Sequence, residues 1–98
     1  MDDKIRYLNE QFVKQVLRRK VEPNEPDYTA SLDAVWTVVC GRSMFPTVSK
    51  KIFPTGFVAT IAGRPNTEGF SKTSAAEALI LCCLLVMGVP EENVPSCE

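Results

Sequence analysis

The spacing of hydrophobic residues predicts an amphipathic helix over residues 2–20. Acidic residues open this segment, and Arg18, Arg19 and Lys20 close it, an arrangement that suits the helix dipole at both ends. The apolar stripe of the helix could pack on the rest of the domain or bind a partner, and we expect it to pack on the domain. The stripe consists of Ile5, Leu8, Phe12, Val13, Val16 and Leu17.

A second helix is expected over residues 32–40. Thr29 or Ser31 can cap its N-terminus, and Gly41 supplies a stop. We interpret Trp36, the single tryptophan of the chain, as a core anchor, with a stacking platform for a ligand as the alternative. The helical spacing i, i+3, i+4, i+7 is met by Leu32, Val35, Trp36 and Val39.

The middle of the chain reads as a β-hairpin. Residues 48–53 and 57–62 flank Pro54, Thr55 and Gly56, which we interpret as the connection, with Gly56 supplying the backbone angles of a turn. The second strand is apolar on both faces, so we expect helices to cover both. Two strands alone are marginally stable, which suggests that a second copy of the chain extends the sheet.

The most apolar stretch covers residues 75–87, with Glu77 as its one charge. Ser74 and Glu77 have the spacing of a capping box, and Gly88 ends the predicted helix. A surface helix needs a polar face, so this helix must be covered by its own fold, a second copy or a target. The elements predict an α+β fold of helix, helix, β-hairpin and helix, a small sheet covered by helices like an α/β/α sandwich.

The length of 98 residues predicts a single domain over residues 1–98. We expect an N-terminal helix over residues 2–20, a compact core over 27–89 and a frayed acidic tail over 91–98. Charged residues near the start replace the apolar core of a signal peptide. The stretch 75–87 is shorter than the roughly 18–20 residues of a membrane span, so we expect a cytoplasmic protein.

Composition argues against several kinds of chemistry. Eleven basic and twelve acidic residues give a net charge of −1, so no overall field draws the chain to nucleic acid. Histidine is absent, which removes imidazole acid–base catalysis and histidine zinc sites. We interpret the four cysteines as small buried hydrophobes, with a disulfide framework or zinc site as the alternative. We therefore predict no catalytic residue, no cofactor, no metal and no enzymatic activity.

Two sets of residues are candidates for binding. Basic side chains could contact a partner protein, or could simply be solvated near a helix end and on an edge strand; they are Arg18, Arg19, Lys50 and Lys51. The loop over residues 63–69, followed by a helix N-terminus, could instead bind an anion or nucleotide. It lacks both glycine-rich phosphate-binding motifs, so an ordinary loop is the alternative. The residues of this second site are Arg64, Asn66, Thr67 and Ser74.

Residues 26–29 (PDYT), the helix LDAVWTVV over 32–39, the hairpin and the final apolar helix ending in MGV together resemble the phage ABA sandwich domain. That family consists of small bacteriophage proteins without an established activity, and the resemblance spans residues 13–89. It implies helices packed on both faces of a β layer and a phage origin, and it transfers no functional residues.

The resemblance leads us to expect a non-enzymatic phage accessory protein that acts in the cytoplasm of the host cell. It would bind and inhibit a host factor, such as a CRISPR effector, by masking its surface. A homodimer through residues 75–87 or through the sheet edge is a further expectation. The alternatives are a sponge that sequesters a nucleotide immune signal and a structural or regulatory phage protein.

Overall fold

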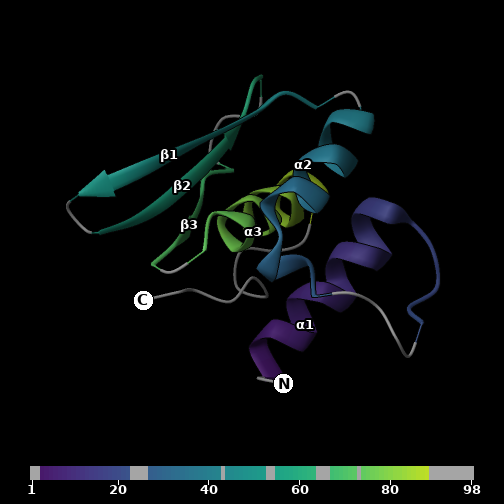
Figure 1. Ribbon diagram of the computed structural model, residues 1–98. Coiled ribbons are helices and arrows are strands. Elements are labelled where there is room, and N and C mark those ends of the chain that lie inside the picture. The colour runs from purple at the N-terminus through teal and green to yellow at the C-terminus, as the bar shows by residue number, and fades with distance from the viewer. Residues whose placement is uncertain are drawn as a thin grey trace.

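The computed structural model describes residues 3–22, 27–42, 44–52, 55–63, 67–72 and 74–88, except for the side chains of Asp3, Lys4 and Lys51. It confirms the α+β class and the order helix, helix, β-hairpin, helix (Figure 1). The elements are α1 (Asp3–Gln11), the π-helical η1 (Phe12–Leu17), the single-turn η2 (Tyr28–Ala30), α2 (Leu32–Gly41), β1 (Pro46–Ile52), β2 (Thr55–Ile61), β3 (Gly69–Ser71) and α3 (Ala75–Val86).

The first predicted helix ends earlier than expected and changes type. After α1 the chain widens into the π-helix η1, and it leaves the helix at Arg18, which has a left-handed φ of 55°. The N–H of Arg18 donates to the carbonyl of Val13 and closes the last turn. The expectation that the apolar stripe packs on the domain is confirmed, because the core includes Leu8, Phe12, Val13 and Val16.

The helix α2 is capped as predicted but packs differently. The Ser31 hydroxyl oxygen accepts a bond from the N–H of Ala34 at 3.3 Å. Val35 and Val39 are fully buried, whereas Trp36 keeps 36% of its surface exposed. The interpretation of Trp36 as a core anchor is therefore wrong. The two valines carry the contact of α2 with the core, and the indole lies at its rim.

The sheet has three antiparallel strands in the order β1-β2-β3. Thr55 and Gly56, expected in the hairpin connection, belong to β2, where Thr55 pairs with Ile52. A Cβ atom on Gly56 would lie 2.6 Å from the Ser71 carbonyl oxygen and 2.8 Å from the Phe70 ring. Glycine is thus required here for packing instead of for a turn. The third strand was not predicted, and it begins at Gly69, the last residue of the loop expected over residues 63–69.

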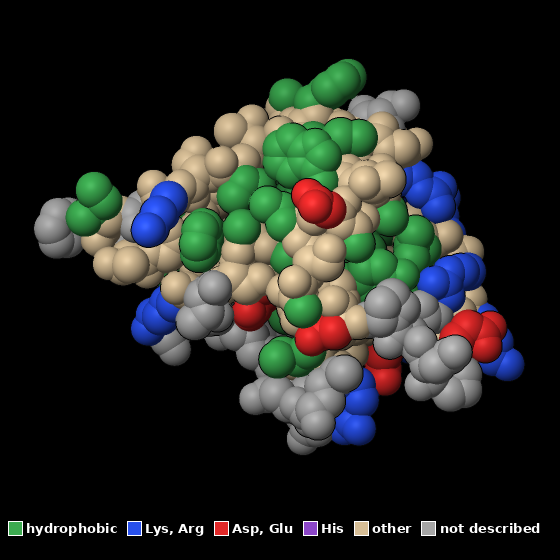
Figure 2. Space-filling view, in the orientation of Figure 1, with side chains coloured by type: hydrophobic (Ala, Val, Ile, Leu, Met, Phe, Trp, Pro, Cys, Tyr) green, Lys and Arg blue, Asp and Glu red, His purple; other side chains and the backbone are tan. Residues whose placement is uncertain are grey.

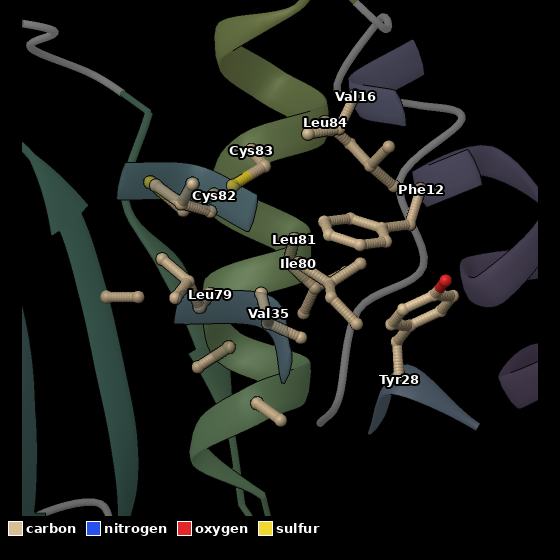
Figure 3. Close-up of a cluster of buried hydrophobic side chains, with 14 of the residues drawn as sticks. Phe12, Val16, Tyr28, Val35, Leu79, Ile80, Leu81, Cys82, Cys83 and Leu84 are labelled. Atoms are coloured by element: carbon tan, nitrogen blue, oxygen red, sulfur yellow. The ribbon is translucent and has the colours of Figure 1, made fainter. Parts of the chain in front are cut away.

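The apolar helix α3 forms the middle layer of the fold. The sheet packs on one side of it, and η1 and α2 pack on the other (Figures 1 and 3). Residues 76–84 of α3 are all buried. Its cover, which the sequence left open, therefore comes from the chain's own elements. In the described part of the chain the helices lie on one face of the sheet, so the layers run sheet, α3, then α1 with α2. The expectation that helices cover both faces, as in an α/β/α sandwich, is therefore wrong for the described elements, because α3 itself is the layer between the sheet and the other helices.

Aromatic contacts join the outer helices to α3. The rings of Phe12 and Tyr28 lie 4.9 Å apart at 53° and face Ile80 and Leu81 (Figure 3). Beyond them, β3 approaches α3 so closely that a Cβ on Gly69 would overlap the carbonyl oxygen of Ala78. The missing side chain therefore sets the distance between sheet and helix.

The start of α3 is fixed by a chain of serine hydrogen bonds. As the capping-box spacing predicts, the Ser74 hydroxyl oxygen accepts from the N–H of Glu77 at 3.1 Å. The same hydroxyl donates to the carbonyl of Thr29 at 2.7 Å, which ties α3 to η2. The Ser71 hydroxyl accepts from the N–H of Ser74 and donates to the buried Glu77 carboxylate at 3.3 Å. These bonds provide partners for polar groups that the fold buries.

Candidate functional site

The inner face of the β1–β2 hairpin loses its cover toward the hairpin tip. Ala59 and Ile61 are buried beneath α3, with exposed fractions of 0% and 4%. On the same face Val48 and Phe57 are half-buried, and Ile52 is 72% exposed. Figure 1 shows the reason, because the hairpin projects beyond the helices. The strands thus carry an apolar face farther than α3 can cover it.

Large exposed hydrophobic side chains occur on α2, just before β1 and at the end of β1. In the described ranges they are Trp36, Phe45 and Ile52, with exposed fractions of 36%, 71% and 72%. Figure 2 shows hydrophobic side chains continuing from α2 onto the hairpin. Single exposed apolar residues are ordinary, but a continuous apolar area such as the one from α2 onto the hairpin is typical of an interaction site. We name the set Trp36, Phe45, Val48, Lys50 and Ile52 the α2–β1 surface.

Lys50 gives the α2–β1 surface a positive charge. It is exposed, and its backbone pairs with Phe57 of β2. Neither β1 nor β2 contains an acidic residue. Lys51 is the next residue along β1, and its side chain lies outside the described part of the structure. The hairpin therefore offers an acidic partner apolar contacts and a cation together.

The predicted basic residues do not form one patch. Arg18 and Arg19 are exposed after η1, which Figure 1 places on the opposite side of the helices from the hairpin tip near Lys50. The Arg19 guanidinium donates to the Tyr28 hydroxyl at 3.4 Å and to the Lys20 carbonyl at 3.3 Å. Arg42 donates to the carbonyl of Leu17 at 3.0 Å. It joins Arg18 and Arg19 through the fold, a grouping that sequence distance conceals.

The predicted anion site is only partly described. Arg64 and Asn66 lie outside the described residues. Thr67 is half-buried, and its side chain hydrogen-bonds to Cys82. The Ser74 hydroxyl already makes the two bonds that cap α3 and hold η2. The anion site stays a prediction.

The cysteines of α3 are structural side chains. Cys82 and Cys83 are buried, as interpreted from the sequence, whereas Cys40 is exposed on α2, so the interpretation is wrong for that cysteine. Cys97 lies outside the described residues. Burial raises the pKa of Cys83 to about 12, with a smaller contribution from Cys82. Burial also raises the pKa of Cys82 against the hydrogen bonds from Thr67 and Gly69. Neither thiol is thus disposed to form the thiolate that nucleophilic chemistry requires.

A polar cluster near Asp27 holds α1 against η2. The Asn9 side-chain amide donates to Asp27 Oδ1 at 3.0 Å and accepts from the N–H of Tyr28 at 2.9 Å. Burial raises the pKa of Asp27, but hydrogen bonds from Thr29 and Asn9 outweigh burial and hold it below the usual value. Asn9 could not be recognised from the sequence, since an asparagine within a helical stripe gives no signal of a distant partner.

Metal, membrane and family comparisons add no further site. Within the described ranges no three His, Cys, Asp or Glu side chains are grouped to hold a metal ion. The helices of those ranges are all too short or too polar to cross a membrane. No known family model, curated protein or solved structure matches the chain. The resemblance to the phage ABA sandwich domain therefore stays a prediction, and the candidate site rests on geometry.

Proposed function

We propose that this protein is a non-enzymatic binding module that recognises another protein through the α2–β1 surface. The observation that carries this proposal is the exposure of Ile52 and Phe45, which with Trp36 are the exposed large apolar side chains in the part of the chain that the structure describes. Protein interfaces have apolar and aromatic centres and a polar rim. Trp36 and Phe45 supply aromatic anchors, and Lys50 supplies the rim charge.

The energy available from these side chains is substantial. Burying a side chain such as isoleucine or phenylalanine contributes about 1.5–3 kcal/mol relative to leaving it exposed. Aromatic residues are also enriched among the side chains that dominate binding energy. A partner that covers Ile52, Phe45 and the rim of Trp36 would therefore gain several such contributions.

The partner that we propose to test first is a host protein of bacterial immunity, such as a CRISPR effector, inhibited by masking its surface. The resemblance to a phage family supports this choice, and the apolar surface supports the binding mode. A phage-encoded inhibitor needs no catalytic group, because occupying a surface is enough to block it.

A pair of variants tests the binding surface. Tagged wild-type protein, the double variant Phe45→Ser with Ile52→Ser, and a control with Lys14→Ser and Lys20→Ser would be incubated with bacterial extract. Bound proteins would then be quantified by mass spectrometry. Because Lys14 and Lys20 are exposed outside the α2–β1 surface, the control should retain the same partner as the wild type. Equal retention by the double variant would contradict the proposal.

The immune-inhibitor version has its own assay. In bacteria with active CRISPR immunity, expression of the wild type should restore plaque formation by a targeted phage. The Phe45→Ser and Ile52→Ser variant should fail to restore it at equal protein level. If strains with several CRISPR types still resist the phage while they express the wild-type protein, this class of partner is rejected. The binding surface would then be tested on its own.

A further inference from the structure

The free edge of β1 carries backbone groups that can pair with another strand. β1 lies at one edge of the sheet, with β2 on its other side. The N–H of Ala62 donates to the carbonyl of Phe45 at 3.1 Å, next to the pair of Pro46 with Ile61. Hydrogen-bonded and non-hydrogen-bonded pairs alternate along an antiparallel ladder. The bond between Ala62 and Phe45 therefore makes the next pair, Pro46 and Ile61, a non-hydrogen-bonded pair, whose backbone groups point away from each other.

The same alternation fixes the direction in which the backbone N–H and C=O groups of each later β1 residue point. Val48, Lys50 and Ile52 occupy the same register position as Pro46, two residues apart. Their N–H and C=O groups therefore point away from β2, toward the free edge. Pro46 fits the same scheme, because proline within a sheet is confined to positions where a donor is not needed by the neighbouring strand. The edge offers a ladder about 20 Å long.

Side chains beside this ladder indicate what kind of strand would fit. On the inner face Val48 and Ile52 offer apolar contacts, and Lys50 stands between them. Directly opposed residues of paired strands interact, and opposite charges there are favourable. A strand with an acidic residue opposite Lys50 and apolar residues on either side would complement this pattern.

We propose that β1 accepts an added strand from the partner protein, an extended segment in which acidic and apolar residues alternate. The proposal rests on the proposed binding function and names the chemistry of the partner. Main-chain hydrogen bonds would supply affinity, and alternate side chains would supply specificity. The inner-face neighbours Val48, Lys50 and Ile52 would read the added strand.

A second copy of the chain is a poorer occupant of the same edge. β1 contains Lys50 and Lys51, and the hairpin strands contain no carboxylate. Pairing β1 with β1 of another copy would concentrate four lysines on one short ladder. Like charges on neighbouring strands are destabilising, and lysines on an edge oppose self-association. The charge of the edge therefore favours an acidic strand from another protein.

A peptide titration tests the occupant. The probe is a fluorescent ten-residue peptide of alternating glutamate and valine, compared with one of alternating lysine and valine. The glutamate peptide should bind the full chain, more weakly as salt rises, and the lysine peptide should bind at least tenfold less tightly. Equal binding of both peptides, or of neither, would overturn the proposal.

Two substitutions at Lys50 separate the contribution of its side-chain charge to peptide binding from that of its backbone N–H. Lys50→Gln should weaken the glutamate peptide about threefold, as expected for an exposed ion pair, and reduce the salt dependence. Lys50→Pro also removes an N–H that makes no bond to β2, so it should abolish binding while the fold is retained. A Lys50→Pro protein that binds as the wild type does would reject strand addition.

Hydrogen exchange on the unmodified chain keeps the test independent of variant folding. Peptide binding should slow exchange of the amides of Val48, Lys50 and Ile52, which point outward. The amides of Thr47 and Ser49, which point toward β2, should change little. Slowed exchange of the outward amides with rising protein concentration and no peptide would instead identify a second copy as the occupant.

The two proposals fail in different ways. If the Phe45→Ser and Ile52→Ser variant still binds the cellular partner, the α2–β1 surface and the strand edge both lose their support. If that variant loses the partner while Lys50→Pro keeps it, the binding surface stands and strand addition is wrong. If both variants lose the partner and the outward amides gain protection, both proposals stand.

Discussion

At the scale of single residues, two glycines allow neighbouring elements to approach closely. Gly56 lies against Phe70 and Ser71, and Gly69 lies against the backbone of α3. Neither glycine has a positive φ, so turn geometry does not explain either one. Both are explained by contacts between elements distant in sequence, which a local pattern cannot reveal.

Gly69→Ala should be among the most destabilising single changes in this chain. Its Cβ would overlap the Ala78 carbonyl oxygen and lie 2.6 Å from the Cys82 nitrogen, and backbone atoms of α3 cannot move aside as a side chain can. We expect a loss of about 3 kcal/mol in the free energy of unfolding, measured by urea denaturation. Gly41→Ala is the matched control, because no atom lies within 4 Å of its Cβ. That helical position should gain up to about 1 kcal/mol.

Asp27 should make the free energy of unfolding depend on pH in the acid range. Although burial raises its pKa, hydrogen bonds from Thr29 and Asn9 outweigh that effect, so the folded pKa lies below the unfolded value near 3.9. The stability that Asp27 contributes is therefore complete above pH 4 and is lost as pH falls toward the folded pKa. Asp27→Asn should lower stability at pH 7 by about 1 kcal/mol and weaken the dependence below pH 4.

Thermal unfolding between pH 3 and pH 7 checks the Asp27 prediction. Asp33→Asn is the control, since Asp33 is an exposed carboxylate near the start of α2. The control should keep the acid-dependent loss of the wild type. An Asp27→Asn protein with the full acid-dependent loss would show that other groups are responsible.

At the scale of elements, the π-helix η1 ends at Arg18, whose left-handed backbone conformation is unfavourable for an arginine. Arg18 has a φ of 55°, in the left-handed region where a side chain is disfavoured by roughly 1–2 kcal/mol. Glycine adopts this conformation without that cost. The sequence pointed to Arg18 only for its charge, and the structure adds that its backbone is left-handed.

Arg18→Gly should therefore raise the free energy of unfolding by up to about 1 kcal/mol. Arg18→Ala, which removes the same charge but keeps a Cβ, should bring no such gain. The difference between the two variants in urea denaturation isolates the backbone effect from the charge. An equal response of both would indicate that the side chain and its charge decide stability here.

Local chemistry made several elements predictable. Ser31 and Ser74 cap helices where their spacing predicts, and the apolar stripe of the first segment packs as expected. The three-residue strand β3 escaped prediction, because Gly69 carries no strand signal without the neighbouring β2. The π-helical turn of η1 was equally hidden, since the apolar spacing there fits an α-helix too.

At the scale of the whole molecule, one helix organises all the layers. α3 is buried by the sheet on one side and by α2 and η1 on the other, so the chain covers its own most apolar segment. This arrangement also determines which residues of the hairpin stay exposed in the candidate site. The exposure of Ile52 depends on how far α3 extends beneath the hairpin, a distance that the strand sequence does not contain.

Because α3 needs no second copy for its cover, we expect the purified protein to be a monomer. Light scattering in dilute solution should give a mass near 10.9 kDa. The edge lysines oppose pairing of β1 with itself, so raising the concentration moderately should not change that mass. A stable dimer would contradict this prediction and would make β1 the first interface to examine.

The position of α3 in the chain has a consequence for synthesis. Every other described element contacts α3 directly or through a neighbour, yet α3 is the last of them to leave the ribosome. Until then the nascent hairpin and N-terminal helix have no common surface on which to bury their apolar faces. We therefore expect folding to wait until residues 75–86 have emerged, and the growing chain to expose apolar surface to aggregation until then.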